Sequence, residues 1–201
     1  MTTDDAPERT GNRQDAQGVP AQDETIPRKK SEGHRGYDIG HAVTRDVNAI
    51  RELVGPYAEQ RILIAKDAVA YYESLSEFRV AREKDTGRVI GCGALHVMWE
   101  DLAEIRTLAV ASDALGQGVG GALVSRLLDD AVAIGVSRVF CLTFEVDFFA
   151  RHGFQIIEGQ AVEPEVYLQL LRSYDEGIAE FLDLERVKPN ILGNTRMLRI
   201  L

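Results

Sequence analysis

A glycine-rich turn between an apolar strand and an apolar helix constrains the fold of this chain more than any other feature of its 201 residues. The turn, LGQGVGG over residues 115–121, follows a strand-like segment at 105–110. After it, apolar residues recur with helical spacing, at Leu123, Leu127, Leu128, Ala131 and Val132. This change from period 2 to period 3.6 predicts a strand-turn-helix unit whose helix begins near Gly118.

The same turn predicts an anion site. Glycines allow positive φ angles and a close approach of the backbone to a ligand. The first N–H groups of a helix have no intrahelical acceptor and lie at the positive end of the helix dipole, an arrangement that suits a pyrophosphate. The chain has no GxxxxGK[ST] sequence, and no early β-α-β unit encloses the turn as in dinucleotide-binding folds. A turn that is glycine-rich for structural reasons alone is the alternative.

The rest of the chain predicts a mixed sheet with helices on both faces, an α/β chain of the α+β type. Strands are expected over 39–43, 78–82, 88–99, 103–110, 137–143 and 195–201, with another starting after residue 153. One early helix, capped by Thr44 or Asp46, would bury Val47, Ile50, Leu53, Val54 and Tyr57. A second, after Asp67, would turn Val69, Tyr72 and Leu75 inward; further helices are expected over 147–151 and from Pro164. Residues 84–87, KDTG, predict a hairpin turn.

The composition of the chain argues against some classes of binding partner. The net charge of −9 opposes a nucleic-acid phosphate backbone. No apolar run of membrane-spanning length occurs, and the N-terminus lacks a signal-peptide core, so a cytoplasmic protein without membrane partners is expected. Residues 1–36 are polar and predict a disordered tail before one domain over 37–201. Cys92 and Cys141 have no CxxC spacing, which favours reduced thiols and no metal site.

Two segments resemble the GNAT acetyltransferases. TLAV followed by GQGVGGALV resembles the Q/R-x-x-G-x-G/A motif of that family, and FFARHGF resembles its Y-x-x-x-G-F signature. The resemblance implies the GNAT fold and acetyl-CoA as acetyl donor. It implies donor contacts from Leu108, Ala109, Val110, Leu115, Gly116, Gln117, Gly118, Val119, Gly120, Gly121 and Phe149. Leu115 stands where the family has Gln or Arg, and Phe149 where it often has a Tyr general acid.

Within that family, the chain resembles the N-acetylglutamate synthases, in particular the short actinobacterial form without a kinase domain. The matching segments are RILIAKDAVAYYESLSEFRVARE, GCGAL, AEIRTLAV and CLTFEVDFFARHGF. The resemblance implies acetyl transfer to the α-amino group of glutamate, the first step of arginine biosynthesis. The basic R-x-S-K-like cluster of longer synthases is replaced by Gly193-Asn194-Thr195-Arg196, which leaves glutamine open as an acceptor.

The acceptor site is expected to use side chains from several segments. The resemblance assigns Lys66, Cys92, Thr195 and Arg196 to the substrate. Arg106 lies in an apolar strand, where an unpaired charge is costly, so it binds either the substrate carboxylate or an acidic partner in the protein. Glu104 shares its face of the strand and is the candidate base, or simply the ion-pair partner of Arg106. Thr143 is the candidate proton donor.

Three functions remain open from the sequence. The first is an amino-acid N-acetyltransferase acting on small molecules. The second is a GNAT enzyme that acetylates a protein N-terminus or lysine, and the third is a non-catalytic acetyl-CoA sensor, which the missing Tyr would suit. A homodimer is also left open.

Overall fold

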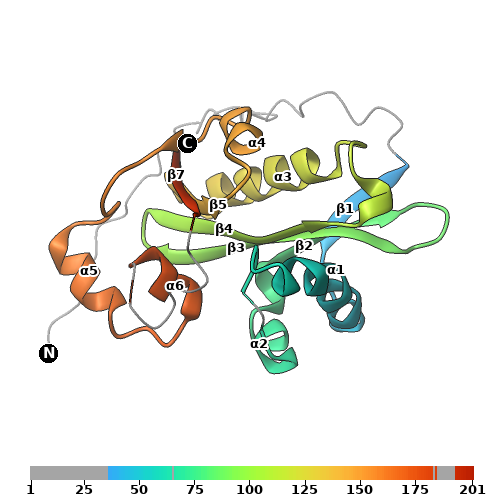
Figure 1. Ribbon diagram of the computed structural model, residues 1–201, viewed down its shortest axis with the longest axis horizontal. Coiled ribbons are helices and arrows are strands. Elements are labelled where there is room, and N and C mark those ends of the chain that lie inside the picture. Colours follow the sequence, from blue (N-terminus) through green and yellow to red (C-terminus); the bar gives the residue numbers. More distant parts are fainter. Residues whose placement is uncertain (1–35, 65, 183, 185–192) are drawn as a thin grey trace, which may run out of the picture. The chain divides into compact units, whose positions relative to one another are not determined.

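The computed structural model describes residues 36–64, 66–182, 184 and 193–201 of the chain. The predicted disordered tail therefore lies outside the described residues, apart from Gly36. The described part contains a seven-stranded sheet in the order β1-β2-β3-β4-β5-β7-β6 (Figure 1). The strands are β1 (Tyr37–His41), β2 (Phe78–Glu83), β3 (Val89–Trp99), β4 (Leu102–Val110), β5 (Arg138–Thr143), β6 (Gln155–Ile156) and β7 (Thr195–Ile200). Its neighbouring strands pair antiparallel, apart from the parallel pair β4 and β5, which confirms the mixed sheet.

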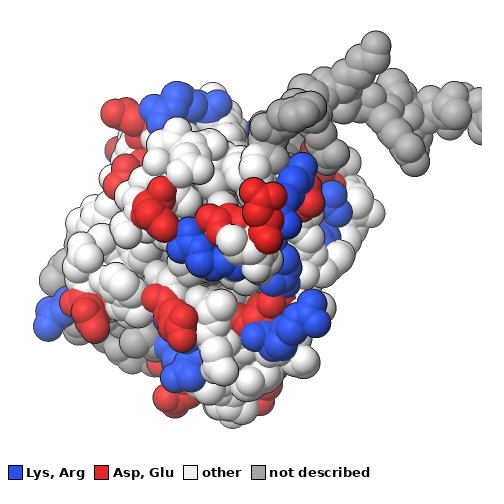
Figure 2. Space-filling view, turned by 90° about the vertical axis from the view of Figure 1, so that its right-hand side faces the viewer, with Lys and Arg blue, Asp and Glu red and all other residues white. Residues whose placement is uncertain are grey.

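Helices cover both faces of this sheet. They are α1 (Val47–Glu59), α2 (Ala68–Glu73), α3 (Val119–Ala133), α4 (Val146–Ala150), α5 (Pro164–Leu170) and α6 (Glu176–Phe181). Helices α3 and α4 lie on one face, and α1, α2 and α6 on the other (Figure 1). None of the helices in the described ranges is long and apolar enough to cross a membrane. On the face drawn in Figure 2, basic and acidic side chains lie beside one another.

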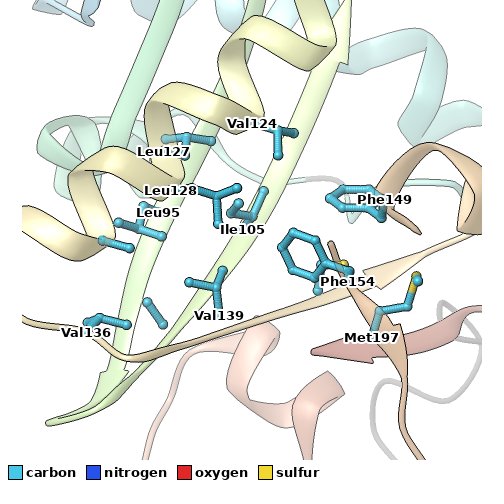
Figure 3. Packing of buried hydrophobic residues seen from close by; sticks show 13 residues of the cluster. Leu95, Ile105, Val124, Leu127, Leu128, Val136, Val139, Phe149, Phe154 and Met197 are labelled. Atoms are coloured by element: carbon cyan, nitrogen blue, oxygen red, sulfur yellow. The ribbon is translucent and has the colours of Figure 1, made fainter. Parts of the chain in front are cut away.

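The core under α3 follows the predicted apolar stripe. Val124 and Leu128 pack in one buried cluster with Leu95 of β3 and Ile105 of β4, and Figure 3 shows these side chains between helix and sheet. The other predicted positions Leu123, Leu127 and Ala131 are buried as well. Val132 is 62 % exposed, contrary to the prediction, because it lies one residue before the helix ends.

The opposite face is covered by α1 as predicted, with Val47, Ile50 and Val54 buried and Leu53 and Tyr57 packed beside them. The strand before α1 ends earlier than expected, because the Asp46 carboxylate accepts a 2.7 Å hydrogen bond from the Val43 N–H in a 3-10 turn.

The inward face predicted for α2 is wrong. Val69 and Tyr72 are exposed, and Tyr71 is buried with its ring 6.0 Å from that of Phe78. Because α2 ends at Glu73, Leu75 falls in a separate 3-10 turn and no continuous stripe forms. A six-residue helix is too short for periodicity to choose its buried face.

Strand β4 contains a bulge. Its register with β3 passes from the pair Cys92 and Ala109 to the pair Ala94 and Arg106, so β4 uses three residues where β3 uses two. Thr107, inside this irregularity, has a φ of 56°, which is uncommon for a β-branched residue.

Strands β4 and β5 separate after a short contact. They pair over 102–104 and 138–140 only, while β5 pairs with β7 along its whole length. The second halves of β4 and β5 therefore have an opening between them, and β4 leads from this opening to the glycine-rich turn.

Candidate active site

The turn before α3 presents backbone donors. Gly116 and Gly118 have φ angles of 76° and 79°. The first hydrogen bond of α3 joins the Ala122 N–H to the Gly118 carbonyl at 3.0 Å. The N–H groups of residues 119–121 precede it and have no intrahelical acceptor. A Cβ on Gly116 would meet nothing within 4 Å, so the turn has room for a ligand close to its backbone. This geometry fits an anion such as a pyrophosphate.

The last two glycines of the turn also serve packing. A Cβ on Gly120 would lie 3.5 Å from Phe148 of α4, and one on Gly121 would lie 3.3 Å from the His152 ring. The absence of side chains here lets α4 pack closely against the first turn of α3. The sequence pattern did not separate this role from anion binding.

The side chains around the turn offer few groups to an anion. The Gln117 amide donates to the Asp113 carbonyl at 2.9 Å, and Leu115 is exposed. Below the turn, the Tyr37 hydroxyl is buried and 3.9 Å from the Cβ position of Gly118. It has no hydrogen-bond partner among the described residues. Any anion at the turn would therefore be held chiefly by main-chain groups.

The strand that leads to the turn presents its backbone too. Ala109 is buried, and Leu108 and Val110 are partly buried on the α3 side. The Val110 carbonyl already accepts a 2.9 Å hydrogen bond from the Tyr57 hydroxyl of α1.

A small inner cavity lies where β4 and β5 separate. Its volume is about 50 Å³. It is lined by Ile62, Leu63, Ile64, Lys66, Glu104, Ile105, Arg106, Thr107, Leu142, Gly177 and Asn194. The bulge in β4 brings the consecutive residues Arg106 and Thr107 into the same wall.

Glu104 is the buried acid of this cavity. The residue is 3 % exposed, and its Oε2 has no hydrogen-bond partner among the described residues. Burial raises the pKa of this carboxyl above its ordinary value, although Arg106, His96 and Lys66 oppose the shift. A carboxylate that holds a proton more tightly than usual is a better proton acceptor for an ammonium group.

Arg106 is held by two acids from other elements. One end of its guanidinium donates to Asp175 Oδ1 at 2.7 Å and the other to Glu77 Oε2 at 3.1 Å. Burial acts against its charge, but Glu104, Asp175 and Glu77 together raise the pKa of Arg106. Its ion pairs within the described residues are with Glu77 and Asp175, so the simple pair with Glu104 is not formed.

Lys66 and Arg106 separate the inner cavity from a larger outer hollow. The hollow has a volume of about 540 Å³ and is also lined by α2, Glu77, His96 and residues 174–176. The His96 ring nitrogen Nδ1 lies 2.8 Å from Glu77 Oε1. Burial, and then the Arg106 charge, lower the pKa of Lys66. The two cations thus face both cavities.

Two of the predicted residues lie deeper than a substrate contact requires. Cys92 is fully buried and donates to the Thr107 carbonyl at 3.6 Å; burial raises the pKa of its thiol to about 12. Thr143 is buried at the end of β5, where its hydroxyl accepts a 2.9 Å hydrogen bond from the Glu145 N–H.

The remaining predicted residues belong to neighbouring packing. Phe149 is in the core under α3, with its ring 5.3 Å from Phe154. Thr195 pairs with Thr143 across β5 and β7. Arg196 donates to the Phe181 carbonyl at 2.6 Å.

Sequence reasoning did not assign Glu77, Asp175, Gly177 or Asn194 to the site, and it did not predict α6. A Cβ on Gly177 would lie 2.8 Å from Arg106 Nη1 and 3.1 Å from Glu104 Oε2, so only glycine fits there without movement. A glycine inside a short helical segment was the one local signal. The described residues contain no cluster of three or more His, Cys, Asp or Glu side chains placed to hold a metal ion.

Comparisons with known proteins agree with this geometry. Residues 47–154 match the family model of the acetyltransferase (GNAT) family. An amino-acid acetyltransferase from Mycobacterium tuberculosis is 56 % identical over 81 % of this chain and 94 % of its own length.

Two solved structures extend the comparison. The crystal structure of Rv2747 from Mycobacterium tuberculosis, a complex with CoA, has a TM-score of 0.79 and 55 % identity, covering 82 % of this chain and 99 % of that one. N-acetylglutamate synthase from Neisseria gonorrhoeae, complexed with coenzyme A and N-acetyl-glutamate, has a TM-score of 0.67 and 26 % identity, covering 85 % of this chain and 36 % of that one.

The glycine turn, the separated strands β4 and β5 and these matches all agree with the family resemblance seen in the sequence. The chain belongs to the acetyltransferase (GNAT) family.

Proposed function

We propose that this protein transfers the acetyl group of acetyl-CoA to the α-amino group of L-glutamate, and also of L-glutamine, as the first step of arginine biosynthesis. The carrying observation is the buried Glu104 carboxyl beside Lys66 and Arg106, whose Oε2 has no hydrogen-bond partner among the described residues, at the point where β4 leads to the glycine-rich turn. The relatives named amino-acid acetyltransferase support the same reaction class.

On the donor side, the turn over 115–121 would hold the pyrophosphate through main-chain N–H groups. Acetyl-CoA supplies the thioester that is cleaved. Backbone groups of Leu108, Ala109 and Val110 would hold the pantetheine arm, and a main-chain N–H near Val110 would polarise the thioester carbonyl. Phe149 would contribute only through packing under this strand, because its ring is buried in the core.

On the acceptor side, Glu104 would take a proton from the substrate ammonium. The free amine attacks the thioester carbon, the C–S bond breaks, and the sulfur leaves with the electron pair. The nitrogen then loses its second proton as the tetrahedral intermediate collapses, and the proposed path of this proton is through the Thr143 hydroxyl, which takes it up as it gives its own proton to the leaving thiolate. Holding amine and thioester together supplies much of the acceleration, since oriented reactants have large effective molarities.

Lys66 and Arg106 would bind the carboxylates of the amino acid. Glutamine is included because Arg106 is already paired with Glu77, and because Gly193 stands where longer synthases have Arg. A neutral side-chain amide brings no second charge into this site. Thr195 and Arg196 would support the site from β7, and Cys92 from within the core.

An assay of CoA release with a panel of free amino acids and with peptides tests the proposal. We expect release with glutamate and glutamine, and none with peptides. Release with peptides alone would indicate a protein acetyltransferase. Binding of acetyl-CoA without release to any acceptor would indicate a sensor.

A further inference from the structure

The loop before α6 contains an acid, Asp175, that pairs with Arg106, the cation proposed to bind the acceptor's carboxylate. Asp175 Oδ1 accepts hydrogen bonds from Arg106 at 2.7 Å and from the Ile178 N–H at 3.0 Å. Gly177, at the start of α6, lies so close to Arg106 and Glu104 that a Cβ there would require their side chains to move. The start of α6 therefore lies directly on the proposed catalytic carboxylate and its neighbouring guanidinium.

The inner cavity is too small for an amino acid in this arrangement. Small-molecule pockets usually measure hundreds of Å³, against about 50 Å³ here. The outer hollow of about 540 Å³ is large enough, and Arg106 and Lys66 form the shared wall. An acceptor that enters from the hollow meets the ion pair of Arg106 with Asp175 before it reaches Glu104.

We propose that Asp175 sets the affinity for the acceptor, because it occupies, in the acceptor-free protein, the position on Arg106 taken by the acceptor's carboxylate. This inference rests on the proposed function. Binding of the amino acid then exchanges one carboxylate for another, and the loop over 171–175 moves outward with Asp175. The strength of the internal ion pair sets the acceptor concentration that the enzyme requires.

Asp175 rather than Glu77 is the acid that leaves, because the two are anchored differently. Glu77 bridges Arg106 and His96 and is followed directly by β2 in the sheet. Asp175 is in a short loop between α5 and α6, next to Tyr174, which is 99 % exposed.

The test is the steady-state kinetics of Asp175→Asn. Asparagine keeps an oxygen for the Ile178 N–H and removes the charge that competes for Arg106. We expect the KM for glutamate to fall by roughly two- to fivefold, the size of a partly exposed ion pair. The KM for acetyl-CoA should not change. Ser173→Ala is the matched control, since it removes only the hydrogen bond from the Asp175 N–H to the Ser173 hydroxyl; its kinetics should equal those of the wild type.

Glu77→Gln tests whether the effect on the KM comes from competition for Arg106 or from the removal of any acid that pairs with Arg106. It should raise the KM for glutamate, because Arg106 loses its fixed partner. An unchanged or raised KM in Asp175→Asn, with wild-type activity present, would overturn the role of Asp175 and leave the proposed function intact. A wild type that acetylates no free amino acid would overturn both.

Hydrogen exchange of the wild type gives a second measurement that needs no variant. Acceptor binding in the presence of CoA should speed exchange at the Ile178 amide, because Asp175 Oδ1 moves away from it. Slower or unchanged exchange at this amide contradicts the inference even if Asp175→Asn fails to fold.

Discussion

The glycine-rich turn and the inner cavity of this protein are built in different ways. The turn consists of seven consecutive residues, presents mainly backbone N–H groups and is partly open to solvent. The cavity combines residues from α6, β4, β5 and the segments around residues 64 and 194, and its charges are mostly buried. Local φ angles and helix geometry fix the positions of the N–H donors in the turn. In the cavity, the charged side chain of Arg106 is instead held by ion pairs with acids from other elements. Substitutions near the turn that add no charge should therefore be mild, whereas the loss of Glu77 or Asp175 would take one partner from the buried Arg106.

The largest effect should follow from Glu104→Gln. Loss of the proposed base should lower kcat by roughly 10²- to 10⁴-fold, the usual contribution of general base catalysis, while acetyl-CoA still binds. Single-turnover kinetics measure the chemical step, and Glu83→Gln, at the exposed hairpin, is the matched control. A kcat within threefold of the wild type would remove Glu104 from the mechanism.

The same variant makes a prediction about stability. Burial raises the pKa of Glu104, so its carboxyl favours the folded state at low pH, and this contribution is lost as pH rises through the raised pKa. Glutamine has no charge to bury. We expect Glu104→Gln to melt at a higher temperature than the wild type at pH 8, with the difference shrinking towards pH 4.

The next largest effect should be on the donor side. Gly118→Glu places a carboxylate beside the bound pyrophosphate, and such like-charge contacts cost several kcal/mol, about a hundredfold in affinity. Calorimetry should show weaker acetyl-CoA binding. Gly118→Ala is the control, because its Cβ meets only the Tyr37 hydroxyl at 3.9 Å. It should cost about 1–2 kcal/mol in stability through its left-handed φ and change acetyl-CoA affinity less.

Lys66→Met should have a smaller effect, confined to the KM for the amino-acid acceptor. A hydrogen bond to a charged group contributes about 1.5–3 kcal/mol, which predicts a glutamate KM raised roughly ten- to hundredfold. The preference for glutamate over glutamine should narrow. Lys84→Met removes an exposed lysine that pairs with Asp38 and should be silent. Wild-type kinetics in Lys66→Met with every amino acid would mean that the carboxylates bind elsewhere.

The smallest effect should come from Tyr37→Phe. Its hydroxyl is buried without a partner among the described residues, so its removal should leave stability unchanged or increase it by up to about 1 kcal/mol. Tyr57→Phe removes a hydroxyl that donates to the Val110 carbonyl and should instead cost about 1 kcal/mol. Denaturant unfolding of both variants shows whether each substitution raises or lowers the free energy of unfolding. Destabilisation by Tyr37→Phe would mean that its hydroxyl is paired in solution.

The sequence predicted the turn and its flanking elements because they depend on neighbours in the chain. The positive φ of Gly118 and the stripe on α3 are local properties that periodicity and glycine spacing reveal. The partners of Arg106 are not local: Glu77 is 29 residues before it and Asp175 is 69 after it. No pattern within one segment shows which distant acids will meet a buried guanidinium, and the sequence left that choice open.

The extra residue in β4 exchanges the faces of the sheet to which the odd- and even-numbered side chains of the strand point. Before it, the odd-numbered Ala103 and Ile105 face α3, and after it the even-numbered Leu108 and Val110 do. A strand alternates strictly, so without the insertion one half of β4 would be turned inside out. Glu104 therefore faces the inner cavity while Leu108 and Val110 face α3, because Thr107, with its positive φ, corrects the count before the strand reaches the glycine-rich turn. One inserted residue therefore sets the orientation of the cavity-lining half of β4 relative to the half that leads to the glycine-rich turn.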